Sequence, residues 1–328
     1  MRRREFIAAL GCALAWPVSG HAQKSSDLPR VGVLMGAAED DMGRARMAAF
    51  IRGLDSAGWR PDGTVRLHVR WGGGVQQELD KAAGEIVAES PNVILANSAR
   101  AVAAINRVNR QIPVVFVATA DPVGQGLVTE LARPGGNLTG FSLYEFSIVT
   151  KMLDLLKAVA PKTERVLFVA NRNTPSFPGW VRELSAATAR MSLALDATGV
   201  GDSANDMESK IDALAAISHA AVVAPPDVFI STNRARLIAA TARNRVSAIY
   251  GYSAAAREGG LMSYGSDIIE LFNRASVYVD RILKGEQPSS LPVQHPTKFE
   301  LAINLKAAKA LGLDVPTSVL LSADEVIE

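Results

Sequence analysis

The chain has 328 residues, enough for two domains with separate hydrophobic cores. Hydrophobic residues make up 48% of it and charged residues 21%, a composition that excludes an intrinsically disordered protein. Lysine and arginine number 35 against 33 for aspartate and glutamate, and residues 1–22 contain the whole of this excess. The rest of the chain is neutral and lacks a basic surface for phosphates, so we expect no nucleic-acid partner.

The first 22 residues have the pattern of an export signal. Residues 2–4 are arginines, residues 6–18 form an apolar run, and small residues precede Gln23. The apolar run is shorter than the roughly 20 residues that a helix needs to span a bilayer. We therefore expect residues 1–22 to be removed as a signal peptide, and the protein to reach the periplasm by the Sec or the twin-arginine route.

Cysteine and histidine are too sparse for the common metal sites. The single cysteine, Cys12, lies in the export segment, so the rest of the chain has no disulfide and no thiolate nucleophile. His68, His219 and His295 are scattered at no metal-ligand spacing. No complete G-x-G-x-x-G fingerprint follows a predicted strand. We therefore expect neither a metal nor a cofactor.

Predicted strands alternate with amphipathic helices through the first half of the chain. Helical spacing is clear in Met47, Phe50 and Leu54, for example, which follow the first strand. The strands are expected at residues 31–35, 65–71, 93–96 and 113–118. This alternation is typical of a doubly wound parallel sheet with crossover helices.

A second set of strand and helix units follows a turn at residues 134–137 and a strand at residues 138–141. Its strands are expected at residues 166–170, 220–224, 248–252 and 261–265, and a long helix runs from Ile268 to Leu283. The fold class is therefore α/β, with two doubly wound, Rossmann-like lobes joined by a hinge. We assign residues 30–142 and about 266–288 to the N-terminal lobe, and residues 143–265 and about 289–328 to the C-terminal lobe.

In doubly wound sheets, ligands bind at the carboxyl ends of the strands. Ser98 and Ala99 follow the third strand and offer helix N-terminal amides and a hydroxyl to a carboxylate. Asp121 follows the fourth strand and either accepts a ligand amine or bonds the amides of its own turn. Glu39 follows the first strand and either faces the ligand or belongs to a solvated helix turn.

The second lobe offers polar and aromatic side chains at equivalent places. Asn171 and Asn173 follow its first strand. Asp227 follows a later strand and either caps the next helix or binds the ligand. Tyr250 and Tyr252 end a further strand, where they either fill the lobe or form a wall for an apolar or ring-bearing ligand.

One segment resembles the nucleophile elbow of a serine hydrolase. Residues 251–255 follow a strand and contain Ser253, and Asp267 and His295 follow in the Ser, Asp, His order. The last glycine of G-x-S-x-G is replaced by Ala255, and no His-Gly-rich oxyanion segment precedes it. Ser253 as a helix N-cap is the competing interpretation, so an exported hydrolase is the rival function.

Several short sequence motifs are spread along nearly the whole chain. They are RVGVLMG at 30–36, DPVG at 121–124, LARPGGNLTG at 131–140, GLMSYG at 260–265, LPVQ at 291–294, PTKFE at 296–300, AKALGL at 308–313 and ADEVIE at 323–328. Together they resemble ABC-transporter substrate-binding proteins of the tryptophan/tyrosine-permease type.

This resemblance implies a type I periplasmic binding protein fold and no enzymatic activity. It implies capture of a small solute between two hinged lobes and delivery to an inner-membrane ABC permease. Some members of the family take aromatic amino acids, so we expect an amino acid with an aromatic or other apolar side chain, bound by a monomer. A ligand sensor that docks to a membrane receptor is a further alternative.

Overall fold

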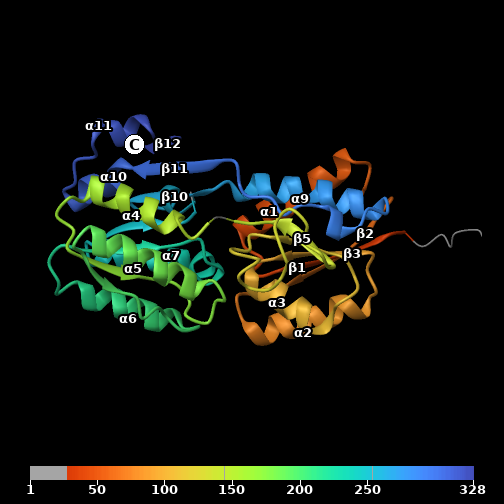
Figure 1. Ribbon diagram of the computed structural model, residues 1–328. Helices are drawn as coiled ribbons and strands as arrows, with labels where there is room; N and C mark the ends of the chain where they lie inside the picture. Colours follow the sequence, from red (N-terminus) through yellow and green to blue (C-terminus); the bar gives the residue numbers. More distant parts are fainter. Residues whose placement is uncertain (1–27, 144, 253) are drawn as a thin grey trace, which may run out of the picture.

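The computed structural model describes residues 28–143, 145–252 and 254–328, which form two lobes, each built on its own sheet (Figure 1). The predicted signal segment, residues 1–22, and the alternative nucleophile Ser253 lie outside the described residues. Both sheets are mainly parallel, and helices cover them. The predicted fold class of two doubly wound α/β lobes is confirmed.

The N-terminal lobe contains a fully parallel sheet with strand order β2-β1-β3-β4-β5. Its strands are β1 (Arg30–Met35), β2 (Arg66–Trp71), β3 (Val93–Asn97), β4 (Val114–Val117) and β5 (Leu138–Phe141). Helices α1 (Asp41–Ser56) and α9 (Ile268–Leu283) pack together on one face, and α2 (Gln76–Ala88) and α3 (Ala99–Val108) on the other (Figure 1). Helix α9 therefore packs on the first sheet although it is separated from it in sequence by most of the second lobe.

The C-terminal lobe contains a larger, mixed sheet with strand order β12-β11-β10-β9-β8-β6-β7. Its strands are β6 (Arg165–Phe168), β7 (Ala194–Asp196), β8 (Ala220–Ala224), β9 (Ser247–Tyr250), β10 (Met262–Ser266), β11 (Phe299–Asn304) and β12 (Glu325–Ile327). Strand β11 runs antiparallel to β10. The sequence pattern predicted neither β11 nor its direction, and the chain enters this strand after α9, which packs on the N-terminal lobe.

The helices of this lobe lie on both faces of the sheet. Val166 and Phe168 pack toward α4 (Ile148–Val159) and α5 (Phe177–Arg190), whereas the intervening Leu167 packs toward the opposite face. That face is covered by α6 (Ala204–Leu214) and α7 (Val228–Arg243). The remaining helical segments are α8 (Ala254–Arg257), η1 (Pro288–Ser290), α10 (Leu305–Leu311) and α11 (Thr317–Leu321).

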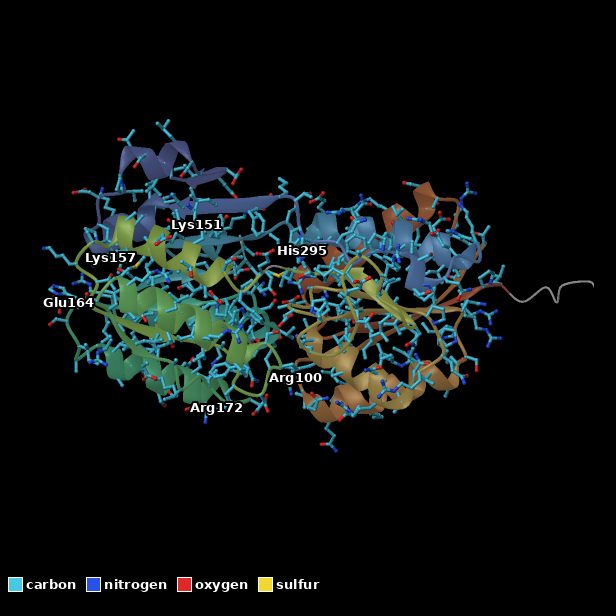
Figure 2. The ribbon with its side chains drawn as sticks, in the orientation of Figure 1. Arg100, Lys151, Lys157, Glu164, Arg172 and His295 are labelled. Atoms are coloured by element: carbon cyan, nitrogen blue, oxygen red, sulfur yellow. The ribbon has the colours of Figure 1, made fainter. Side chains whose placement is uncertain are left out.

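The chain passes between the lobes after β5, after β10 and before β11, and these passages lie side by side. The Ser142 amide donates to the Gln294 carbonyl at 2.8 Å, and the Ser266 hydroxyl donates to the Leu143 carbonyl at 2.8 Å. His295, in the passage before β11, lies between the two lobes in Figure 2. Hydrogen bonds thus join adjacent passages into one hinge.

Candidate functional site

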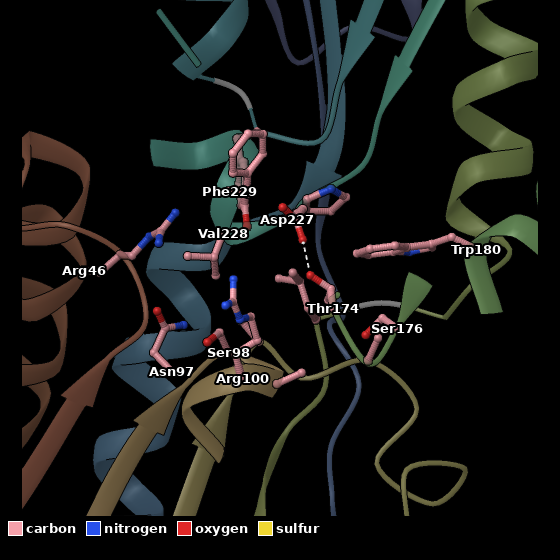
Figure 3. Close-up of a pocket in the computed structure, with 16 residues that line it drawn as sticks. Arg46, Asn97, Ser98, Arg100, Thr174, Ser176, Trp180, Asp227, Val228 and Phe229 are labelled. Carbon is pink, nitrogen blue, oxygen red and sulfur yellow. Dashed lines mark hydrogen bonds between the residues drawn. The ribbon is translucent and has the colours of Figure 1, made fainter. Parts of the chain in front are cut away.

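A pocket lies between the lobes and is lined by residues of both (Figure 3). Its cavity volume is about 30 Å³, far below the roughly 300–1,000 Å³ typical of small-ligand sites, so a bound solute needs the lobes to stand farther apart than they do here. The first lobe contributes residues that follow β3 and β4 together with α1, and the second contributes the segments after β6, β8 and β9. The pocket is therefore at the carboxyl ends of parallel strands, where a doubly wound fold binds its ligands.

The N-terminal end of α3 forms one side of the pocket, as the sequence predicted for Ser98 and Ala99. The Ser98 hydroxyl oxygen caps the helix by accepting from the Ala101 amide at 3.3 Å. Ser98 has a φ of 91°, a left-handed conformation that costs energy for a residue with a side chain. A Cβ added at Gly36 would lie 2.3 Å from the Ser98 oxygen, so only glycine leaves room for this cap.

Arg46, from α1, is a buried cation in the pocket wall with 2% of its surface exposed. Its guanidinium lies 5.3 Å from the centre of the Tyr252 ring, and its Nε atom has no hydrogen-bond partner in residues 28–143, 145–252 and 254–328. Among the described residues, no carboxylate lies within 4.0 Å of it. Burial lowers the pKa of Arg46 because the charged form is removed from water.

Asp227 is the matching buried anion, on the opposite lobe, with 3% of its surface exposed. One carboxylate oxygen caps α7 by accepting from the Ile230 amide, and the other accepts from the Thr174 hydroxyl at 3.0 Å (Figure 3). No cationic side chain of the described residues forms an ion pair with it. Burial raises the pKa of Asp227, and the hydrogen bonds and the charge of Arg100 offset this only in part.

Gly251 allows the loop that carries Asp227 to pack closely against it. A Cβ at Gly251 would lie 2.1 Å from the Pro226 nitrogen, so a larger residue would displace the loop that carries Asp227. The position of the carboxylate therefore depends on two segments that are distant in sequence.

Aromatic side chains form the apolar part of the pocket lining. Trp180, Phe229 and Tyr252 are 1%, 6% and 8% exposed. Burial raises the pKa of Tyr252 to about 12, so its hydroxyl stays protonated at neutral pH. A ligand could bury a ring or a branched apolar group against these three side chains.

Three predicted residues do not line the pocket because each has another partner or faces solvent. The Asp121 carboxylate accepts from the Gly124 amide at 2.8 Å and so closes its own turn. Glu39 is exposed and precedes Asp40, the N-cap of α1. The Tyr250 hydroxyl is buried against the Thr241 hydroxyl at 2.7 Å, inside the lobe.

Asn171 and Asn173 also lie outside the pocket lining, for a different reason. Their side-chain amides donate to Asp202, at 2.6 Å and 3.3 Å respectively. Asp202 in turn pairs with Arg100, which does line the pocket. The two asparagines therefore support a residue near the pocket without facing it.

Sequence reasoning missed Arg46, Arg100, Trp180 and Phe229. Trp180 and Phe229 lie within helical apolar patterns that look the same whether they face a core or a ligand. Arg46 stands among other arginines at the start of α1, and nothing in the sequence separates the buried one from the exposed Arg44.

The described residues contain no group of three or more His, Cys, Asp or Glu side chains placed to hold a metal ion. Within the same residues, no helix combines the length and apolarity needed to cross a bilayer.

Comparison with known proteins identifies the family. The model of the family "ABC transporter substrate binding protein" matches residues 31–327. A tyrosine-binding protein of Clostridioides difficile (strain R20291) is 24% identical over 283 residues, which cover 84% of this chain and 78% of that protein.

Solved structures share the fold. A conserved domain protein from Vibrio cholerae is 25% identical with a TM-score of 0.84, and an ABC domain from Streptococcus pneumonia in complex with L-Trp is 24% identical with a TM-score of 0.85. Each match covers 92% of this chain and 100% of the other. A ligand-free, open substrate-binding protein with adhesive properties from Clostridium difficile is 22% identical over 92% of this chain and 99% of that chain, with a TM-score of 0.66.

Proposed function

The chain belongs to the family of ABC-transporter substrate-binding proteins, and we propose that it captures a free amino acid with an aromatic or other apolar side chain between its lobes. One observation carries this proposal. Arg46 and Asp227 are buried in one pocket, come from opposite lobes and have no ionic partner among the described residues. A zwitterionic amino acid brings one negative and one positive group, and so supplies a partner for each of them.

The N-terminal lobe binds the carboxylate. The Arg46 guanidinium provides the positive charge, and its Nε donor has no partner among the residues that the structure describes. The amides at the N-terminus of α3 add the positive end of a helix dipole, and the Ser98 hydroxyl can donate while its oxygen caps the helix.

The C-terminal lobe binds the ammonium through Asp227. Thr174 and the Ile230 amide fix the orientation of the carboxylate, and a solute ammonium adds the missing positive charge. Because the two charges of the solute contact different lobes, binding of the zwitterion favours the arrangement in which the lobes are closed.

The side chain of the solute packs against Trp180, Phe229 and Tyr252. Two relatives support a ring-bearing solute: one structure holds L-Trp, and the curated relative is named a tyrosine-binding protein. A flat aromatic ring buries a large area against such a wall, which favours it over a short side chain.

The family consists of solute-binding proteins rather than enzymes, and we propose an inner-membrane ABC permease as the partner of a monomer in the periplasm. The export pattern of residues 1–22 supports this location, as does the place where ABC-transporter substrate-binding proteins typically work, outside the cytoplasm.

Titration calorimetry with three related compounds tests the proposal. L-tryptophan carries both charges, tryptamine lacks the carboxylate, and 3-indolepropionic acid lacks the ammonium. We expect L-tryptophan to bind and each analogue to bind at least about a hundredfold more weakly, because it leaves Arg46 or Asp227 buried without a partner.

Phenylalanine, tyrosine and leucine, titrated in parallel, rank the side chains that the aromatic wall accepts. Equal affinity for L-tryptophan and both analogues would contradict recognition of a zwitterion. Absence of binding for every amino acid tested would contradict the proposed solute class.

A further inference from the structure

Two ion pairs connect the lobes beside the pocket. Arg100 of α3 pairs with Asp202 of the C-terminal lobe at 3.1 Å, and Arg234 of α7 pairs with Asp40, the N-cap of α1, at 2.9 Å. Among the described residues, the other ion pairs lie within one lobe or in the passages between lobes. We propose that these two pairs are a closing latch, and that Asp40 and Asp202 set the solute affinity without touching the solute.

In the first pair, each side chain is oriented by hydrogen-bond partners from its own lobe. The Arg100 side chain is 8% exposed, and its guanidinium also donates to the Gly74 carbonyl and the Gln76 side chain of its own lobe. On the other lobe, Asn171 and Asn173 hold Asp202. Closing therefore freezes little additional side-chain motion, the main cost that makes ordinary surface ion pairs weak. Figure 2 shows Arg100 at the junction of the lobes.

In the second pair, too, partners from the same lobe orient each side chain. Glu258 holds the Arg234 guanidinium from within the C-terminal lobe at 2.8 Å, and the Ser231 carbonyl accepts from it at 2.9 Å. The Asp40 carboxylate is oriented by the Gly43 amide, which donates to one oxygen and leaves the other for Arg234. Each side chain thus keeps its local partners when the lobes separate and loses only the contact across the cleft.

The two acids are distinct from the solute site. Neither Asp40 nor Asp202 lines the pocket, whereas Arg100 does. Neutralising either acid therefore leaves the proposed solute contacts in place and weakens closure, although at Asp40 it also removes a charge that acts on Arg46, so the solute-free distances are the decisive readout for that acid. Because apparent affinity is the intrinsic affinity multiplied by the fraction of closed molecules, the affinity falls with that fraction.

Distance measurement between spin labels tests the latch without any solute. In a Cys12→Ser background, labels at Lys81→Cys on α2 and Ser185→Cys on α5 report the separation of the lobes from exposed positions. We expect Asp40→Asn and Asp202→Asn to shift the population toward longer distances. Asn remains a good N-cap, so the Asp40 variant keeps α1 intact.

Matched controls remove an acid that pairs within its own lobe. Asp41→Asn breaks the pair with Arg44, and Asp212→Asn breaks the pair with Arg243, and neither should change the distances. Asp202→Glu keeps the charge and should restore most of the closed population. About 1 M salt should open the parent protein and have less effect on the doubly substituted Asp40→Asn, Asp202→Asn variant.

Affinity gives a second readout, which rests on the proposed function. With L-tryptophan as the titrated compound, each Asn variant should bind about two- to fivefold more weakly, and the double variant by the product of the two factors. Failure of L-tryptophan to bind contradicts the proposed function and leaves the solute-free distances valid. Distances in both Asn variants equal to those of the parent would overturn the latch.

Discussion

Two charged side chains, Arg46 and Asp227, are buried in the pocket without an ionic partner among the described residues. Each is at least 97% buried, and within the part of the chain that the structure describes the Nε of Arg46 has no hydrogen-bond partner. A buried charge without a counter-charge destabilises the closed protein. Such residues raise the free energy of the unliganded protein. A ligand that pairs with them gains the most binding free energy there.

The first prediction concerns Asp227→Asn. Asparagine keeps the cap of α7 and can still accept from Thr174, while it removes a charge that burial disfavours. We expect the unliganded variant to melt no earlier than the parent at neutral pH, and its affinity for L-tryptophan to fall by about 3 to 5 kcal/mol. Thermal melting and titration calorimetry measure both effects.

The pH dependence of the protein's stability follows from the raised pKa of Asp227. A raised pKa means that the folded protein holds this proton more tightly than the unfolded chain. Its contribution to stability is therefore full below the ordinary value of 3.8 and is lost as the pH rises through the folded pKa. The stability of Asp227→Asn relative to the parent should increase over that interval. A variant that melts earlier and binds normally would show that Asp227 is only a helix cap.

The second prediction concerns Arg46→Gln, with Arg44→Gln as the matched control on the same helix. Arg44 is exposed and pairs with Asp41, so its loss should leave binding unchanged. Loss of Arg46 removes the partner of the solute carboxylate, and we expect L-tryptophan to bind at least about a hundredfold more weakly.

Tryptamine separates this effect from misfolding. It has no carboxylate, so its weak binding should be the same in the parent and in Arg46→Gln. If L-tryptophan loses no affinity in that variant, Arg46 is not the carboxylate partner.

At the scale of elements, helix N-termini converge on the cleft. Asp40, Ser98 and Asp227 cap α1, α3 and α7, and these helices follow β1, β3 and β8. The strand, turn and helix order predicted Ser98 and Asp227 as cleft residues. The same order also offered Asp121, which follows β4, as a cleft residue. It could not show that the Asp121 carboxylate accepts from the Gly124 amide in its own turn, because that contact exists only in the folded protein.

The third prediction tests the strained cap of α3. Ser98→Ala removes the hydrogen bond from the Ala101 amide while keeping a Cβ at a φ of 91°, and should cost about 1 kcal/mol. Ser98→Gly also loses the cap, but glycine adopts positive φ without strain, so it should be more stable than the alanine variant. Urea denaturation compares them, and a glycine variant less stable than the alanine variant would refute the strain.

The fold could be predicted further than the site because it depends on repeated local patterns. Buried strands followed by apolar helical spacing identified both lobes, and the long helix from Ile268 to Leu283 corresponds to α9. Strand β7 was missed because three partly exposed residues carry no alternation. The role of Asn171 depends on Asp202, which lies 31 residues farther along the chain. Such pairings exist only in the folded protein.

In the whole molecule, the charged residues between the two lobes fall into two groups. The proposed solute contacts, Arg46 and Asp227, face the pocket, and the proposed latch acids, Asp40 and Asp202, stand outside its lining. This separation allows the solute specificity and the strength of closure to vary independently. The passages between the lobes are joined to one another by hydrogen bonds.

A crystal structure of the protein with L-tryptophan would show which residues contact the solute. We predict that the solute lies between the lobes, with its carboxylate within hydrogen-bond distance of the Arg46 guanidinium and its ammonium within hydrogen-bond distance of the Asp227 carboxylate. Its ring should pack against Trp180, Phe229 and Tyr252. A solute bound between the lobes with neither charge contacting Arg46 or Asp227, or a solute bound outside the cleft, would contradict the proposed roles of these two residues.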